Sequence, residues 1–496
     1  MARVTQVTAP IRRSAVVTGF MTTVSVGVMT LCAAIAGALL AHDFGRSAQT
    51  DGFFTAYGVY ILLVLAATAF RVVVLPSLAR AAQAGRLAAE VIGYAGSFLL
   101  LAVPLLVLAL AAAHPFAWLL TGGGNKATQN AAAGAIVWLV PAAMAQVYAG
   151  LAASALAALD DYGTAAFSFA LGAVVALGVF AAFDGHGPVA LAWGLAAGGF
   201  LSLAILAAEL LRRRGPAAIP GVELRLLPRL GELMQGVALP LALQGLYVIA
   251  NRFAGGAKVG SVTSFGYAYL IAAALVALAS SPLSLVSAVP LTRRGVGDER
   301  AVVHVVSTSW LALTLVAAVA GVFALAGEQV AHTLLGSSFA GATGAQLGRL
   351  VVYLSPWMVA SIGVGVTLPL LFVLGRRRPL PVLAVAALIV DVPIEWAARS
   401  AFGLTGVALG LAVTTVLVFA ALLAVLSAHT LARVAEGLVV PVLGIGALGA
   451  LAFGVAAHLL DPIPAAALGL ALYAGLLAAM RPRGLRAAWG YVRALH

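Results

Sequence analysis

The chain has 496 residues, of which 63% are hydrophobic and 9% are charged, and its formal net charge is +12. This composition excludes an ordinary soluble domain, in which about a quarter of the residues are charged. The positive charge alone would suit a nucleic-acid-binding protein, but no basic patch with interleaved aromatic residues stands apart from the apolar runs, so nucleic acid is not expected as a partner. Cys32 is the single cysteine, which excludes an intrachain disulfide.

Fourteen apolar runs are long enough to span a bilayer, which takes about 20 residues of helix. They predict an all-α polytopic membrane protein, and no connecting segment is long enough to fold as a separate catalytic domain. The predicted spans cover residues 14–41, 53–75, 91–113, 131–156, 164–183, 188–211, 232–254, 264–290, 304–327, 347–374, 379–401, 404–428, 437–459 and 463–480.

Most of the 28 basic residues fall in the N-terminal segment, in every second gap between the runs, and in the C-terminal tail. The opposite gaps carry Arg46, Lys126 and Lys258. By the positive-inside rule, both termini are expected in the cytoplasm. The gap with Asp160 and Asp161 has no basic residue and is an exception, although acidic residues contribute little to orientation.

Motifs for enzyme chemistry are scarce. The Gly122–Gly124 run has neither a Walker pattern nor a strand before it, and the eight histidines show no spacing typical of metal ligands. We therefore expect no catalytic activity, no cofactor and no bound metal. Any transport would be driven by an ion gradient (H⁺ or Na⁺), by the membrane potential or by the gradient of the substrate.

The two halves of the chain share a faint repeat. Similar residues occur at 185–194 and 403–410, in the connections that lead into the sixth and twelfth spans. In addition, Phe54, Tyr57 and Pro76 in the second span correspond to Phe265, Tyr269 and Pro290 in the eighth. Six spans separate the copies, so both halves have one orientation and a pseudo-two-fold axis along the membrane normal is expected. The predicted parts are an N-lobe (1–211, spans one to six), a cytoplasmic linker (212–231), a C-lobe (232–428, spans seven to twelve), and two extra spans with a basic cytoplasmic tail (429–496).

Two stretches resemble a known family. Residues 44–56 (FGRSAQTDGFFTA), which continue to LPSLA at 75–79, are similar to the first-to-second helix region of the MurJ (MviN) lipid II flippases. Residues 260–263 (GSVT), Tyr267-Ala268 and the VPL at 289–291 resemble the eighth helix of that family. These flippases belong to the multidrug/oligosaccharidyl-lipid/polysaccharide (MOP) exporter superfamily. The resemblance implies two bundles around a central cavity, a groove for a polyprenyl tail formed by the last two helices, and a bacterial cytoplasmic membrane.

The chain departs from the family at its cavity arginines, which grip the pyrophosphate of the substrate. Aligned on Thr50-Asp51, the first helix has Thr30 and Ala36 at those positions, and the second has Val64 and Leu65. The eighth has Tyr267-Ala268-Tyr269-Leu270 in place of the family's Tyr-Ala-Asp-Arg. A buried pyrophosphate needs charge-assisted partners, so other groups would have to hold it.

Ionisable residues inside spans are candidates for function, because each costs about 2.5–3.5 kcal/mol at the centre of a membrane helix. Asp391 lies near the middle of the eleventh span beside Pro393, and Glu395 and Arg399 follow on the same helical face. Three interpretations stay open: a self-neutralising ion-pair ladder, a substrate or coupling role for Asp391, and packing against another helix of the lobe.

The other candidates also have structural interpretations. We expect Arg252, next to Asn251, either to contact an anionic head group or to extend to the membrane interface. We expect Arg71 to extend to the interface at the other side. Gln146 and Gln244 bridge helices or line the cavity. Asp51 is read as a helix cap at the start of the second span.

The sequence thus favours a flippase for a lipid-linked oligosaccharide or a peptidoglycan precursor, acting as a monomer on a polyprenyl-linked glycan among membrane lipids. One alternative is a cation-coupled multidrug antiporter of the same superfamily, although twelve spans usually suffice for that branch. Another is a non-transporting membrane scaffold in cell-wall synthesis.

Overall fold

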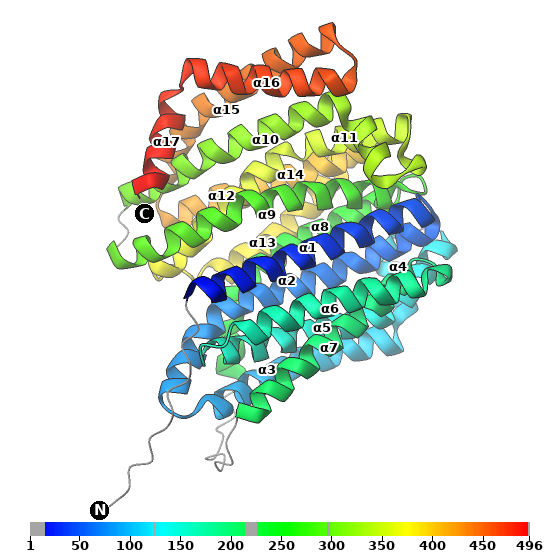
Figure 1. Cartoon of the computed structure of the whole chain (residues 1–496), viewed down its shortest axis with the longest axis vertical. Helices are drawn as coiled ribbons and strands as arrows, with labels where there is room; N and C mark the ends of the chain where they lie inside the picture. Colours follow the sequence, from blue (N-terminus) through cyan, green and yellow to red (C-terminus); the bar gives the residue numbers. More distant parts are fainter. Residues whose placement is uncertain (1–14, 124, 214–225, 295–297, 495–496) are drawn as a thin grey trace, which may run out of the picture.

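A computed structural model describes residues 15–123, 125–213, 226–294 and 298–494, and within these ranges the chain is helical and contains no strand. Fourteen of the described helices are long and apolar enough to cross a membrane, which confirms the predicted number of spans. They run side by side in one elongated bundle (Figure 1).

The first six spans are formed by α1 (Ala15–Phe44), α2 (Ala48–Gln83), α3 (Leu87–Ala111) with α4 (Ala113–Thr121), α5 (Lys126–Ala157), α6 (Gly163–Ala182) and α7 (Val189–Arg213). The next six are α8 (Leu226–Gly255), α9 (Ser261–Arg294), α10 (Asp298–Leu335), α11 (Ala342–Tyr353) with α12 (Ser355–Val373), α13 (Leu380–Phe402) and α14 (Leu404–Leu426). The chain continues as α15 (Ala428–Leu459), α16 (Pro462–Met480) and α17 (Arg483–Ala494), and two 3-10 turns, η1 (Asp184–His186) and η2 (Ser337–Phe339), lie in the loops.

One predicted span is a broken helix, and another is followed directly by a short helix. The break between α11 and α12 falls at Leu354, directly before Ser355-Pro356, because a proline in the first turn supplies no backbone N–H and cannot continue the preceding helix. The break between α3 and α4 falls at Ala112, shortly before Pro115. The chain from Leu226 to Gly231, predicted as linker, already belongs to α8.

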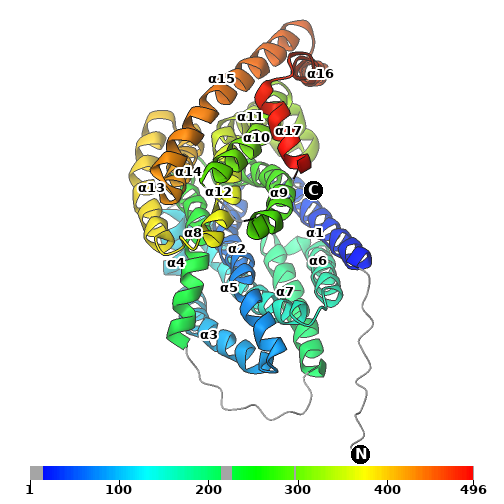
Figure 2. The same ribbon diagram turned by 90° about the vertical axis from the view of Figure 1, so that its left-hand side faces the viewer.

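The same helix pairs pack together in each half of the chain. In the first half, α1 packs on α6, α2 on α5, α5 on α7, and α6 on α7. In the second half, the pairs at the corresponding positions are α8 with α13, α9 with α11 and α12, α12 with α14, and α13 with α14. The repeat expected from the sequence is therefore present in the packing as two six-span lobes, with α15 and α16 attached to the outside of α10 (Figure 2).

Small residues allow these helices to approach closely. A side chain on Gly198 of α7 would lie 2.2 Å from the carbonyl oxygen of Gly172 in α6, and one on Gly52 of α2 would lie 2.4 Å from that of Thr128 in α5. Glycine at such points lets backbones touch, which is how membrane helices gain packing energy without a hydrophobic driving force.

The two ends of the bundle differ in charge. The end at which α7 stops carries Arg212 and Arg213, and the turn before α13 and the tail after α16 lie at the same end (Figure 1). We call this the arginine-rich end, and the end at which α2 and α9 begin the opposite end.

Candidate functional site

At the opposite end, Asp51 links the two halves. The residue is 4% exposed, and its carboxylate accepts hydrogen bonds from the backbone N–H groups of Gly260 (2.6 Å) and Thr263 (2.8 Å) and from the Thr263 hydroxyl (2.6 Å). These donors lie at the start of α9. Asp51 therefore does not cap its own helix, α2, which Ser47 caps, and instead caps α9 of the other half. The positive end of the α9 dipole also stabilises a carboxylate at this position.

Arg46 strengthens the same contact. Its Nε donates to the carbonyl oxygen of Gly260 (3.0 Å), and one Nη donates to the Thr343 hydroxyl (3.0 Å). Burial lowers the pKa of Arg46, which the nearby charge of Asp51 partly offsets, and the guanidinium stays protonated at neutral pH. Gly260 has a φ of +84°, and a side chain there would collide with Arg46. We call this group, Arg46, Asp51, Gly260 and Thr263, the Asp51 contact.

Deeper between the halves lies an aromatic cluster. It is made of Tyr57 and Tyr60 from α2, Tyr247 from α8, Tyr269 from α9 and Trp357 from α12. The rings of Tyr57 and Tyr60 stack at 5.6 Å, those of Tyr247 and Tyr269 at 3.9 Å, and Trp357 lies 4.9 Å from Tyr269. Two of these rings come from the repeated positions Tyr57 and Tyr269.

Two predicted amides belong to this cluster. Gln244 accepts a hydrogen bond from the Tyr269 hydroxyl (3.2 Å), so it bridges α8 and α9, one of its two predicted roles. Asn251 is 1% exposed and lies beside the Tyr247 hydroxyl and Gly58 of α2. Neither the Asn251 amide nor the Tyr247 hydroxyl has a partner at hydrogen-bond geometry in the described part of the chain. Buried polar groups without partners are costly, and a ligand could satisfy these.

A second polar site lies inside the second half. Asp391 and Glu395 of α13 are both fully buried, and their four carboxyl oxygens have no hydrogen-bond partner among the described residues. They face α14, where the Glu395 carboxyl lies against Gly410 and the Thr414 hydroxyl is the side-chain donor next to Asp391. The predicted ladder with Arg399 does not form, because the Arg399 guanidinium lies against Gly256 in the turn before α9.

The structure separates the remaining predicted residues. Arg252 is exposed at the opposite end and donates to the carbonyl oxygen of Leu119 in the last turn of α4 (3.2 Å), a favourable place for a cation. The Gln146 amide lies against Gly199 of α7, within the first half. Arg71 is part of α2, and its side chain lies outside the described residues.

At the arginine-rich end, Arg229 joins α8 to the first half. Its Nη2 lies 2.6 Å from a Glu90 carboxylate oxygen of α3, and its guanidinium sits 5.5 Å above the centre of the Tyr94 ring. We call this the Arg229 contact. With the Asp51 contact, it joins the two halves at both ends of the bundle.

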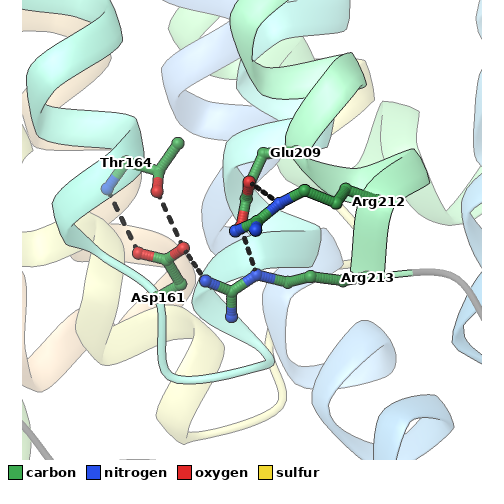
Figure 3. Close-up of polar contacts among 5 residues, drawn as sticks. All are labelled: Asp161, Thr164, Glu209, Arg212 and Arg213. Carbon is green, nitrogen blue, oxygen red and sulfur yellow. Dashed lines mark hydrogen bonds and ion pairs between the residues drawn. The ribbon is translucent and has the colours of Figure 1, made fainter.

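A separate ion-pair network explains the exception at Asp160 and Asp161. Asp161 binds Arg213 and accepts hydrogen bonds from the backbone N–H (3.1 Å) and the hydroxyl (2.8 Å) of Thr164 (Figure 3). Glu209 holds Arg212 (2.8 Å) and Arg213 (2.6 Å). The acidic turn therefore lies at the arginine-rich end, where the alternation of spans places it, and its basic neighbours come from another gap.

An apolar cavity of about 790 Å³ lies beside the extra spans. It is an open pocket lined by α10, the junction of α11 with α12, α14 and α15, and its lining residues include Val316, Gly321, Val359, Phe419, Val442 and Phe453. Of the last two spans, α15 lines it. Ser355 adds a hydroxyl without a hydrogen-bond partner in the described ranges.

Comparison with known proteins gives a likeness of fold. The Lipid II flippase MurJ in an inward closed conformation matches with a TM-score of 0.73 and 12% identity, over 94% of this chain and 100% of that one. A MATE family multidrug resistance transporter of the MOP superfamily, inward-facing, matches with a TM-score of 0.61 and 16% identity, over 84% of this chain and 97% of that one. The MATE multidrug transporter DinF-BH matches with a TM-score of 0.57 and 14% identity, over 83% of this chain and 94% of that one.

This chain has the MOP exporter fold. No family model and no curated protein matches it in sequence.

Proposed function

We propose that this chain is a flippase that moves a lipid-linked oligosaccharide or a related cell-wall precursor across a bacterial cytoplasmic membrane by alternating access. The observation that carries the proposal is the extent of the likeness. The flippase matches 94% of this chain, whereas the MATE transporter matches 84%. The two spans beyond the two lobes, α15 and α16, suit a substrate whose lipid tail lies outside the central site.

The apolar cavity supports a lipid tail. Its walls come from α15 and from the side of the second half that faces it, and its lining is almost entirely hydrocarbon. An isoprenoid or acyl chain is stabilised in such a cavity because its apolar contacts there replace contact with water or with the bilayer, and it needs no polar partner.

The aromatic cluster supports a neutral, hydroxyl-rich head group. Tyrosine and tryptophan rings stack on the apolar faces of sugars, although in this conformation the rings are buried against one another and must separate to admit one. The Asn251 amide and the Tyr247 hydroxyl, which have no hydrogen-bond partner among the described residues, offer both donors and acceptors. The cation–π contact of Arg229 is made with Tyr94, outside this cluster, so we assign the cluster to the sugar and not to the phosphate of the substrate.

The buried carboxylates supply a coupling site. Two ionised carboxylates at Asp391 and Glu395 would be strongly unfavourable without a cation, because the site is buried and excludes water. A proton or Na⁺ taken up by the pair removes that cost, and its release can drive the change between the two conformations.

Multidrug antiport is the second candidate. It is favoured by the likeness to the MATE transporters and by the same carboxylates, which would exchange a cation against an organic ligand in the aromatic cluster. A non-transporting scaffold is the third, and it predicts that substitutions in the cluster change no transport.

Reconstitution separates these functions. Purified protein in liposomes is given a fluorescent polyprenyl-linked sugar, and its movement between leaflets is followed by accessibility to a membrane-impermeant reagent. In parallel, ethidium efflux is measured under a pH or Na⁺ gradient. The proposal expects movement of the lipid-linked sugar, reduced at least tenfold by Tyr269→Ala. Ethidium transport alone would establish the antiporter, and transport of neither probe would contradict the proposal.

A further inference from the structure

The helix α17 was not expected from the sequence, which predicted only a basic tail. It begins at Arg483, directly after the last span ends at Met480, and Arg481 (φ 43°) and Pro482 turn the chain between them. A helix that starts this close to the end of a span lies at the membrane surface. It runs along the arginine-rich end beside α10 (Figures 1 and 2).

One side of α17 is docked. Ala488 is fully buried, and Gly484 lies so close to the Trp310 ring of α10 that a side chain there would come within 2.2 Å of it. The Tyr491 hydroxyl lies 3.1 Å from Nδ1 of His304, also in α10. Burial raises the pKa of Tyr491, so its hydroxyl stays protonated and can hold this hydrogen bond. These contacts fix which side of the helix faces away from the protein.

The other side is basic and carries a large aromatic ring. Arg481, Arg483 and Arg486 are exposed, and Trp489 is 53% exposed. Residues 483, 486 and 489 follow each other at intervals of three, so they form one stripe along the helix. The sequence from residue 481 to 496 contains no acidic residue that could neutralise the arginines.

We propose that this stripe, Arg483, Arg486 and Trp489, together with Arg481 just before the helix, binds the head groups of anionic phospholipids in the leaflet at the arginine-rich end. The guanidinium groups match phosphate oxygens in charge and in bidentate geometry. The indole ring is the side chain that settles at the boundary of head groups and acyl chains. The charge complementarity selects anionic over zwitterionic lipid, and the docked side holds the stripe against the membrane. The inference does not depend on what the protein transports.

Fluorescence quenching by brominated lipids tests this in the full-length protein. Nanodiscs contain equal parts of phosphatidylglycerol and phosphatidylcholine, and one or the other lipid is brominated. The Trp489 signal is the difference between wild type and Trp489→Phe. We expect brominated phosphatidylglycerol to quench this signal at least twofold more than brominated phosphatidylcholine.

Two triple variants show whether the arginines are responsible. The variant Arg481→Gln/Arg483→Gln/Arg486→Gln leaves the docked side of α17 unchanged. In this variant, the ratio of quenching by brominated phosphatidylglycerol to quenching by brominated phosphatidylcholine should fall close to one. Arg376→Gln/Arg377→Gln/Arg378→Gln removes three exposed arginines from a turn at the same end and should keep the preference. Equal quenching in wild type, no quenching by either lipid, a preference that survives the first triple variant, or one lost in the second would each overturn the proposal.

Discussion

At the scale of single residues, the side chains that matter most are polar groups whose partners are distant in the sequence or missing. Asp51 accepts hydrogen bonds from residues more than two hundred positions away. Asp391 and Glu395 sit side by side with no partner in the described part of the chain. The first arrangement stabilises one conformation, and the second is the cation-coupling site that we propose.

Asp51→Asn should loosen the opposite end of the bundle. The amide loses the charge that strengthens three hydrogen bonds, and bonds to a charged group contribute about 1.5–3 kcal/mol each. We expect an at least tenfold increase in the population of molecules in which the first turns of α2 and α9 are separated. Distances between spin labels on the two halves measure it. Asp43→Asn, at an exposed site of the same end, is the control. Identical distance distributions in Asp51→Asn and wild type would rule out this role.

Asp391→Asn and Glu395→Gln should abolish the response of transport to an ion gradient without unfolding the protein. The neutral side chains keep the volume and remove buried charge, so thermal stability in detergent should stay the same or rise. Transport is measured with and without imposed H⁺ and Na⁺ gradients. Glu436→Gln, exposed in α15, is the control. Full gradient dependence in both carboxylate variants would reduce the pair to a structural feature.

At the scale of elements, α8 is the helix shared between the halves. It packs on α2 and α3 of the first half as well as on α13 and α14 of the second. Its first turn is held by Glu90 and Tyr94, and its last turn carries Arg252, bound to α4. Movement of the halves against each other must therefore break contacts at one or both ends of α8.

Arg229→Gln should free the first turn of α8 at the arginine-rich end. The loss of a half-buried ion pair and a cation–π contact corresponds to about 1–2 kcal/mol. A cysteine at Leu233, buried in wild type, should then react with a soluble thiol reagent roughly five to thirty times faster. Arg433→Gln, which breaks an exposed pair, serves as control. An unchanged rate in Arg229→Gln would show that this pair does not hold α8.

At the scale of the whole molecule, the sequence was sufficient for the number of spans and for the two-lobe plan, because hydrocarbon thickness sets a length and a repeat sets the order. It was not sufficient for contacts between spans, since a carboxylate such as Asp51 can cap either the nearest helix or a remote one. The break at Leu354 had a local signal in Pro356, and α17 had one in the spacing of Arg483, Arg486 and Trp489. The ladder at Glu395 failed because helical spacing does not say which neighbour Arg399 prefers.

The orientation in the membrane remains a prediction from arginine placement. In a Cys32→Ser background, single cysteines at Lys126 and Lys258 should react with an impermeant thiol reagent added to intact cells, because both lie at the opposite end. Cysteines at Arg213 and Arg377 should react only after permeabilisation. The reverse pattern would invert the assignment of cytoplasmic ends.

In the alternating access that we propose, the two halves move against each other, and a contact at the opposite end must open for the substrate to leave. Asp51→Cys with Thr263→Cys places two thiols at positions whose side chains are hydrogen-bonded across the two halves, and the loss of free thiols on oxidation measures how much disulfide forms. Movement of the polyprenyl-linked sugar should fall to background in liposomes after oxidation and return after reduction, while each single cysteine variant is insensitive to oxidant. Undiminished movement with the crosslink fully formed would contradict alternating access in this protein.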